Sequence, residues 1–237
     1  MKNLYTFISP NNKLDNDHRK MLEAQIENSL EYWKSEDIIL ACNFAYEYKG
    51  IKAIELPDLI NSQYPENPRA IINSKINVII YLLENKLIDD FTWYHDFDSW
   101  QLAPLDVPPL TDTEDMGVVC YGFYPFKLFS YWGKNRQKLA EITTITEYGF
   151  LRRANFGSIF FKPSSLDIFK DILTRMDGDK IYEEDAMSLM LEESEELCQR
   201  IRIMNPTYNI GIRCVRTNIE VSAKPIKVVH FPPNKPR

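Results

Sequence analysis

Glycine is scarce in this chain, which has eight glycines in 237 residues. Neither a P-loop nor a G-x-G-x-x-G sequence occurs, so the usual glycine-rich cradles for nucleotide phosphates are excluded. Cysteine is also rare, and the four cysteines, Cys42, Cys120, Cys198 and Cys214, form no C-x-x-C pair and have no nearby pair of histidines. A zinc site or a disulfide framework is therefore not expected, and we predict reduced, mostly buried thiols.

A long hydrophobic run is missing as well. No segment approaches the roughly 20 apolar residues that span a bilayer, and the opening MKNLYTFIS is too short and too polar for a secretory signal. We therefore expect a cytoplasmic protein without a membrane partner. With 44% hydrophobic and 26% charged residues, the chain fits one domain over residues 1–237, and residues 231–237 are predicted to form a mobile tail.

Basic residues are concentrated in two stretches of a chain whose net charge is −6. Residues 201–237 hold seven Lys/Arg and one acid, and residues 127–153 hold six Lys/Arg and two acids. Local basic surface on an acidic protein favours a phosphorylated or polyanionic ligand. A solvated surface of mixed charge is the alternative interpretation of the same residues.

The opening of the chain predicts a strand, a helix and a second strand. Residues 3–8 have the composition of a strand and lead into the turn-like Ser9-Pro10-Asn11-Asn12. Asp17 is expected to cap a helix that runs to about Trp33, and residues 37–42 are a short apolar run typical of a buried parallel strand. This βαβ opening predicts an α/β fold with a mixed, mostly parallel central sheet.

The rest of the chain continues this alternation without an internal repeat or a low-complexity linker. Ser164 or Ser165 is expected to cap one of the later helices. Apolar spacing predicts helices over residues 73–87, 134–142, 166–176 and 183–197, and strands over residues 91–94, 118–124, 159–161, 201–204, 210–215 and 226–229.

The sharpest chemical feature is Asp96-Phe97-Asp98, at the end of a predicted apolar strand. On an extended chain, two residues separated by one other point to the same side, and ligands of an open α/β sheet bind at the carboxyl edge of its strands. Two carboxylates at that edge suit Mn²⁺ or Mg²⁺, which prefer oxygen ligands and also coordinate substrate phosphates. A chance D-x-D triplet is the alternative, but its position after a helix and a strand favours a metal site.

This arrangement resembles the glycosyltransferases of the GT-A fold, over nearly the whole chain but on a few short motifs. The resemblance implies a Rossmann-like domain, a nucleotide-diphosphate sugar as donor, with UDP as the expected nucleotide, and Mn²⁺ or Mg²⁺ bound by Asp96 and Asp98. Three further donor contacts are implied. Ser9-Pro10-Asn11 resembles the loop that holds the base and ribose, Lys75 occupies a place for a basic residue near the donor, and Asn155-Phe156-Gly157-Ser158 resembles an N-x-G turn that approaches the sugar.

Two more segments carry the resemblance. Val229-His230-Phe231 with Lys235-Pro236 resembles a His-x-x-x-x-Lys-Pro segment, in which the histidine completes the metal shell and the lysine meets the diphosphate. Pro232-Pro233 replaces the usual glycine of that loop, a departure that affects Lys235 more than His230. Glu183-Glu184-Asp185 resembles an acidic helix start that contacts acceptor or sugar, and Glu184 and Asp185 are the candidates for a catalytic base in an inverting enzyme. A retaining enzyme needs no protein base of this kind.

The acceptor stays open between a saccharide and a hydroxylated pyrimidine in DNA, because unanchored enzymes of this kind include bacteriophage proteins that add sugars to such bases. The basic stretches suit duplex phosphates and equally the donor diphosphate. A DNA enzyme would work in the host cytoplasm and would extrude its base from the stack. Two other classes also stay open: a metal-dependent nucleotidyltransferase, which normally has a glycine-rich first loop that is absent here, and a non-catalytic module that binds nucleotide sugars.

Overall fold

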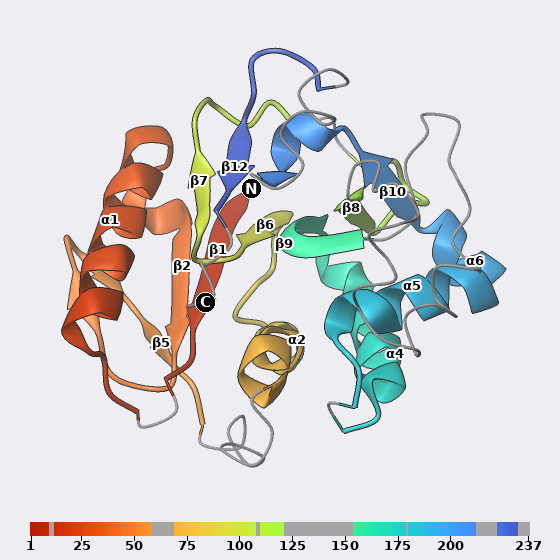
Figure 1. Cartoon of the computed structure of the whole chain (residues 1–237), viewed down its shortest axis with the longest axis horizontal. Helices are drawn as coiled ribbons and strands as arrows, with labels where there is room; N and C mark the ends of the chain where they lie inside the picture. The colour runs from red at the N-terminus through yellow and green to blue at the C-terminus, as the bar shows by residue number, and fades with distance from the viewer. Residues whose placement is uncertain are drawn as a thin grey trace, which may run out of the picture.

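A seven-stranded sheet runs through the middle of the molecule (Figure 1). The computed structural model describes residues 1–9, 12–57, 69–107, 110–120, 154–178, 180–211 and 222–231. In chain order, the strands of this sheet are β1 (Lys2–Phe7), β2 (Ile38–Cys42), β5 (Ile54–Glu55), β6 (Thr92–His95), β8 (Met116–Cys120), β9 (Ala154–Phe161) and β10 (Ile201–Met204).

The spatial order of these strands is β10-β8-β9-β6-β1-β2-β5. Every neighbouring pair in this described sheet is parallel except the two pairs that β9 makes with β6 and β8. The predicted mixed, mostly parallel sheet is therefore confirmed. Because β1, β2, β5 and β6 run the same way, their carboxyl ends meet at one edge, which is where ligands bind in open α/β sheets.

Helices cover both faces of the sheet (Figure 1). On one face Leu22 and Ile26 of α1 pack with Tyr5 and Leu40, and α2, α4 and α5 pack on the opposite face, in a core that includes Leu4. Tyr5 and Leu4 serve different faces because side chains alternate along a strand. The helices are α1 (Asn16–Tyr32), α2 (Arg69–Glu84), α4 (Leu166–Met176), α5 (Glu183–Glu193) and α6 (Glu195–Gln199), with 3₁₀ turns η1 (Ser35–Asp37), η4 (Pro163–Ser165) and η5 (Pro206–Tyr208). Within the part of the chain that the structure describes, no helix has the length and apolar character that crossing a membrane requires.

A second, three-stranded sheet brings together segments that are far apart in the sequence. Strand β7 (Ser99–Gln101) pairs antiparallel with β12 (Val228–His230), and β12 pairs parallel with β11 (Ile210–Gly211). Figure 1 shows β7 and β12 side by side next to the central sheet. A hairpin of β3 (Glu47–Tyr48) and β4 (Ile51–Lys52) completes the strands. The small sheet matters because β7 directly follows Asp96-Phe97-Asp98, and β12 ends at His230.

One predicted helix cap was wrong, and another is confirmed in position but not in its hydrogen bond. The first helix is capped by Asp15, whose carboxylate accepts hydrogen bonds from the N–H groups of Asp17 and His18, so Asp17 lies inside the helix. Ser165 does occupy the position before α4, but its hydroxyl donates to the carbonyl of Lys162 instead of accepting from the helix. The bounds predicted for α4, residues 166–176, are confirmed.

The other boundaries differ by a few residues. The predicted helix 183–197 is interrupted at Ser194, whose hydroxyl accepts from the Leu197 N–H and begins α6 as a separate helix. Helix α2 spans Arg69–Glu84 where residues 73–87 were predicted, and β9 starts at Ala154, well before residue 159. The predicted helix 134–142, residues 121–124, residues 212–215 and residues 232–237 of the tail lie outside the described residues.

Candidate metal centre

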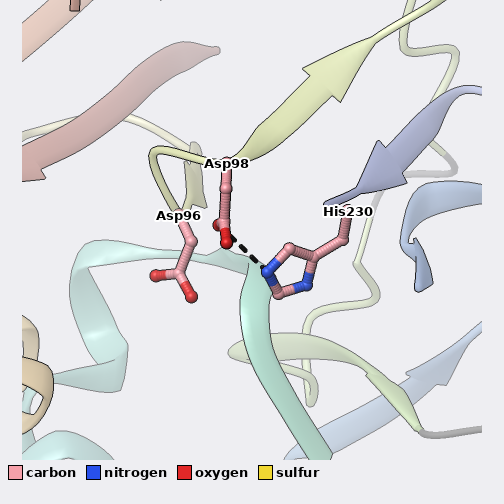
Figure 2. A group of neighbouring side chains, drawn as sticks. All are labelled: Asp96, Asp98 and His230. Carbon is pink, nitrogen blue, oxygen red and sulfur yellow. Dashed lines mark ion pairs between the residues drawn. The ribbon is translucent and has the colours of Figure 1, made fainter. Parts of the chain in front are cut away.

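Asp96-Phe97-Asp98 forms a tight turn between β6 and β7. The Ser99 N–H donates to the Asp96 carbonyl at 3.0 Å, which closes a four-residue turn, here called the metal turn (residues 96–99). The expected extended geometry was therefore wrong. The turn nevertheless brings the carboxylates of Asp96 and Asp98 to one place at the carboxyl edge of the parallel strands (Figure 2).

His230 reaches this turn through strand pairing. It lies opposite Ser99 in the β7–β12 ladder, and the Phe231 N–H donates to the Asp98 carbonyl at 2.9 Å. His230 Nε2 lies 3.0 Å from Asp98 Oδ1 (Figure 2). One possible ligand atom from each of Asp96, Asp98 and His230 lies within 4.8 Å of the other two. The structure thus brings together the three side chains that the sequence predicted as metal ligands.

These three side chains fit a divalent cation such as Mn²⁺ or Mg²⁺. Carboxylate oxygens are the ligands that hard cations prefer, and imidazole is a common ligand of metal ions in proteins. Two ligand atoms on opposite sides of such an ion lie about 4.2 Å apart, since each bond is about 2.1 Å long. A small inward shift would therefore close the group around an ion. Among the described residues, it is the only group of three or more His, Cys, Asp or Glu side chains with this geometry.

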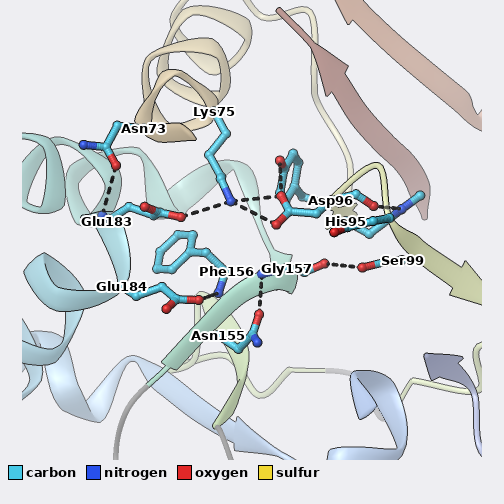
Figure 3. A network of polar contacts seen from close by, with 12 residues as sticks. Asn73, Lys75, His95, Asp96, Ser99, Asn155, Phe156, Gly157, Glu183 and Glu184 are labelled. Atoms are coloured by element: carbon cyan, nitrogen blue, oxygen red, sulfur yellow. Dashed lines mark hydrogen bonds and ion pairs between the residues drawn. The ribbon is translucent and has the colours of Figure 1, made fainter. Parts of the chain in front are cut away.

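Strand β9 passes close to His230 at Gly157. A Cβ atom at this position would lie 2.5 Å from His230 Cε1 and 2.6 Å from Nδ1, so only glycine leaves room for the ring. The β8–β9 register breaks between Asn155 and Ile159, and such bulges are frequent beside active sites because they redirect a strand. The Gly157 carbonyl accepts from the Asp96 N–H at 2.9 Å, and Asn155 Oδ1 accepts from the Gly157 N–H at 2.6 Å (Figure 3).

Lys75 of α2 lies between Asp96 and Glu183 of α5 and contacts both carboxylates (Figure 3). Its Nζ lies 2.9 and 3.2 Å from the two carboxylate oxygens of Asp96 and 3.0 Å from Oε1 of Glu183. The Tyr94 hydroxyl also donates to Asp96 Oδ1, at 2.8 Å. Asp96 Oδ1 thus accepts from two donors and Oδ2 from one, which leaves Oδ2 the oxygen with more capacity for a ligand.

The charges of this group determine its protonation. Burial opposes the charged form of Lys75, but the carboxylates of Asp96 and Glu183 raise its pKa well above the ordinary value. Burial likewise opposes an ionised Asp96, yet the positive charges of Lys75 and His230 hold the pKa of Asp96 below its usual value. Burial raises the pKa of Glu183, and Lys75 offsets only part of that effect. Asp96 is therefore the acid of this pair that stays ionised most readily.

Helix α5 opens with three acids, Glu183, Glu184 and Asp185, which point in different directions because successive helix residues do not share a face. Glu183 faces Lys75, and its second oxygen, Oε2, is buried and has no hydrogen-bond partner among the described residues. Glu184 Oε1 accepts from the Phe156 N–H at 3.4 Å (Figure 3). Asp185 is 4% exposed. Of the two predicted bases, Glu184 therefore contacts the strand that carries Gly157.

A pocket of about 460 Å³ opens at the same edge of the sheet. Asn43 joins the loops around it: its Oδ1 accepts from the Ser9 N–H at 2.9 Å, and its Nδ2 donates to the Ser9 carbonyl at 2.7 Å and to Asn12 Oδ1 at 2.5 Å. Ser9 thus lies beside the pocket, where its donor contact stays a prediction. The pocket is lined by residues that follow β1 and β2 and by the end of β5: Asn12, Asn43, Phe44, Ala45, Glu55, Leu56 and Pro57.

Three aromatic rings connect this pocket to the metal turn. Phe97, between the two aspartates, packs against Phe7 at the end of β1 with ring centroids 5.1 Å apart. Phe7 packs in turn against Phe44 of the pocket wall at 5.8 Å. The pocket and the candidate metal ligands are therefore neighbours along one edge of the sheet.

The remaining predicted site residues have mixed outcomes. Pro10, Asn11 and Lys235 lie outside the described residues, as does the basic stretch 127–153. Sequence interpretation missed Tyr94 and Asn43. Tyr94 precedes Asp96 by two positions, so the alternation of a strand could have identified it. Nothing in the sequence distinguishes Asn43 from other loop asparagines.

The chain has the GT-A fold of known glycosyltransferases. The galactosyltransferase LgtC, solved in complex with donor and acceptor sugar analogs, is 14% identical with a TM-score of 0.61, over 99% of this chain and 88% of that chain. A glycosyltransferase involved in the glycosylation of the major capsid of PBCV-1 is 10% identical with a TM-score of 0.57, over 99% and 95%. Mouse xyloside xylosyltransferase 1 is 10% identical with a TM-score of 0.57, over 100% and 99%. No protein-family model matches the sequence, and no curated protein sequence matches it.

Proposed function

We propose that this protein is a glycosyltransferase that moves a sugar from a nucleoside-diphosphate sugar to an acceptor hydroxyl, with Mn²⁺ or Mg²⁺ bound by Asp96, Asp98 and His230. The observation that carries the proposal is the convergence of these three side chains at the carboxyl edge of a GT-A sheet. The neighbouring pocket, and the likeness to LgtC, which was solved with donor and acceptor sugar analogs, support it.

The pocket is the proposed place for the donor nucleoside. It lies beside the metal turn through the contacts of Phe97, Phe7 and Phe44, so a nucleoside there would direct its diphosphate toward Asp96 and Asp98. The loop with Ser9 would border the nucleoside, as the resemblance implies. UDP is the nucleotide that we expect.

The residues around the metal ligands support sugar transfer chemically. When the bond to the sugar breaks, negative charge develops on the diphosphate, and a bound divalent cation supplies a Lewis acid that offsets it. The chain's own residues prepare the site. Lys75 keeps Asp96 ionised and fixed in direction, and Oε2 of Glu183, which has no partner in the part of the chain that the structure describes, would accept from a sugar hydroxyl. Asn155 and Gly157 would present the backbone of β9 to the same sugar.

Glu184 is the proposed base if the reaction inverts the anomeric centre. A carboxylate within hydrogen-bond reach of the acceptor hydroxyl assists removal of its proton. Glu184 is half-buried and contacts β9 at Phe156, whereas Asp185 is buried. This geometry favours Glu184 over Asp185 among the two predicted candidates.

A saccharide is the proposed acceptor. In the described part of the basic stretch 201–237, Arg202 pairs with Glu114 and Lys227 pairs with Asp106, so these two cations are already neutralised. Such pairing makes these two cations less available for duplex phosphates, which need unneutralised cations. A hydroxylated pyrimidine in DNA remains an outcome that an acceptor screen would detect.

The experiment is a panel of nucleotide sugars incubated with Mn²⁺ and the wild-type protein, with release of nucleoside diphosphate measured. We expect release from one donor class, loss of release on removal of the metal with EDTA, and recovery on adding Mn²⁺ again. Asp98→Asn should abolish release, because it removes a ligand charge while keeping the side-chain shape. Asp89→Asn, at an exposed position away from the metal turn, is the matched control and should retain activity.

Other results would favour the alternatives. Release of pyrophosphate from a nucleoside triphosphate and a sugar phosphate would indicate a nucleotidyltransferase. Binding of a nucleotide sugar without turnover, unchanged in Asp98→Asn, would indicate a binding module. If the wild type neither binds nor turns over any nucleotide sugar, the proposed function is wrong.

A further inference from the structure

Strand β7, which follows the metal turn, has two edges with different partners. Toward β12, the backbone groups of Asp98 and Leu102 form hydrogen bonds of 2.9 and 2.8 Å. In an antiparallel pair, alternate residues direct their N–H and C=O groups away from the partner strand. Ser99 and Gln101 therefore direct theirs toward the opposite edge, which faces helix α1.

At this opposite edge, α1 takes the place of a neighbouring strand. Asn28 Nδ2 donates to the Gln101 carbonyl, and Asn28 Oδ1 accepts from the Gln101 N–H, both at 3.0 Å. Gln25 Nε2 donates to the Ser99 carbonyl, also at 3.0 Å. Gln25 and Asn28 are three positions apart, so they lie on one face of the helix. Two side chains thus bind three backbone groups of β7.

The first residue of the metal turn is held by His95. His95 Nδ1 lies 3.1 Å from the Asp96 carbonyl oxygen, and Nε2 lies 2.9 Å from Asn3 Oδ1. Asn3 Nδ2 donates to Ser29 Oγ of α1 at 3.1 Å, so this path also ends at α1. The Trp93 ring stacks on His95, with centroids 4.2 Å apart, and keeps the imidazole in its plane.

We propose that Gln25, Asn28 and His95 are positioning residues that hold both ends of the metal turn, so that Asp96 and Asp98 converge on one cation. This inference rests on the proposed function, because it requires the metal centre. Gln25 is 1% exposed and His95 is fully buried, so water does not replace a lost contact and the turn has to move instead. Substituting residues that orient metal ligands typically weakens metal binding by about 10–100-fold.

The test measures Mn²⁺ affinity by titration calorimetry, together with the melting temperature in the absence of metal. The variants are Gln25→Leu, Asn28→Asp, His95→Leu and His95→Asn. Ile172→Ala, at a buried position of α4, is the control for general loss of stability. We expect Kd for Mn²⁺ to rise about tenfold or more in Gln25→Leu and His95→Leu. His95→Asn should recover most of that loss, because its amide offers a donor near the former Nδ1 position.

The outcomes separate this inference from the proposed function. If the wild type binds Mn²⁺ and Gln25→Leu and His95→Leu bind it equally well, the positioning role is wrong and the metal centre stands. If Ile172→Ala weakens Mn²⁺ binding as much as Gln25→Leu and His95→Leu do, the effect is one of stability and the inference fails. If the wild type does not bind Mn²⁺, both proposals fall. Should the leucine variants not fold, Asn28→Asp, which keeps the acceptor for the Gln101 N–H, should still weaken binding several-fold; unchanged binding would overturn the role.

Discussion

The imidazole of His230 occupies the space that a side chain at position 157 would need, since a Cβ on Gly157 would lie 2.5 Å from His230 Cε1. Gly157→Ala should therefore displace the ring from Asp98. We expect Mn²⁺ affinity to fall about tenfold or more, as for other changes that misorient a metal ligand. Titration calorimetry with Mn²⁺ measures this directly.

Gly211→Ala is the matched control for that substitution. Gly211 lies opposite His230 in the β11–β12 ladder, and a Cβ there would meet no atom of the described residues within 4 Å. It should leave Mn²⁺ affinity unchanged. Equal affinity in Gly157→Ala and the wild type would mean that His230 is not a ligand, or that the ring moves without consequence.

The buried Lys75 should be essential to stability. Its side chain is 9% exposed and bridges Asp96 and Glu183, so Lys75→Met leaves the buried carboxylate of Glu183 and the half-buried carboxylate of Asp96 without their cation. Removing one partner of a buried ion pair typically lowers the free energy of unfolding by about 3–5 kcal/mol. Urea denaturation of the metal-free protein checks this value.

Two comparison variants make the Lys75 experiment specific. Lys170→Met removes the exposed ion pair with Glu84 and should cost less than about 1 kcal/mol. The double variant Lys75→Met/Glu183→Gln removes one of the two unpaired charges and should be more stable than Lys75→Met alone. If the double variant is no more stable, the charge of Glu183 is not what Lys75 neutralises.

Much of the fold follows from the sequence because its signals are local. The apolar run at residues 38–42 and the amphipathic segment 166–176 specify their own strand and helix, and the βαβ order restricts the sheet to a mostly parallel one. The error in the cap of the first helix also has a local cause: Asp15 and Asp17 are both good N-cap residues, and composition does not choose between them.

The site was only partly predictable because its contacts are not local. Asp96 and Asp98 were identified from their position at the end of a predicted strand, and His230 through a resemblance. Their meeting depends on the pairing of β7 with β12, which no local pattern specifies. The role of Glu183 was missed for a similar reason. Three consecutive acids open α5, and only the packing of α2 against the sheet decides which of them faces Lys75.

Acid should weaken one tertiary ion pair of the scaffold. Arg200 donates to both carboxylate oxygens of Asp167 and lowers the pKa of Asp167. A lowered pKa in the folded state means that the stabilisation is present above the unfolded-state pKa of about 3.9 and is lost as the pH falls through the folded-state pKa. The difference in unfolding free energy between the wild type and Asp167→Asn should therefore be largest near pH 7 and should shrink as the pH falls below the unfolded-state pKa of about 3.9. Urea titrations at several pH values measure this difference, with Asp112→Asn, at an exposed position, as the control substitution.

Asn43 should control nucleotide binding without affecting the metal. Its side chain holds the N–H and carbonyl of Ser9, which is 5% exposed, and also contacts Asn12 at the pocket. Asn43→Ala leaves the buried Ser9 N–H without its acceptor, while the Ser9 carbonyl keeps the Asn12 N–H at 3.2 Å. The unpaired N–H should lower the free energy of unfolding by about 1–3 kcal/mol. The loop after β1 then loses its fixed position, so the affinity for a nucleoside diphosphate should fall about tenfold or more.

Mn²⁺ affinity in the absence of nucleotide should stay at the wild-type value, because no ligand of the metal turn contacts Asn43 in the described structure. Asn43→Asp keeps the acceptor for the Ser9 N–H, so its affinity for a nucleoside diphosphate should lie between those of the wild type and Asn43→Ala. An unchanged nucleotide affinity in Asn43→Ala would place the donor nucleoside outside this pocket.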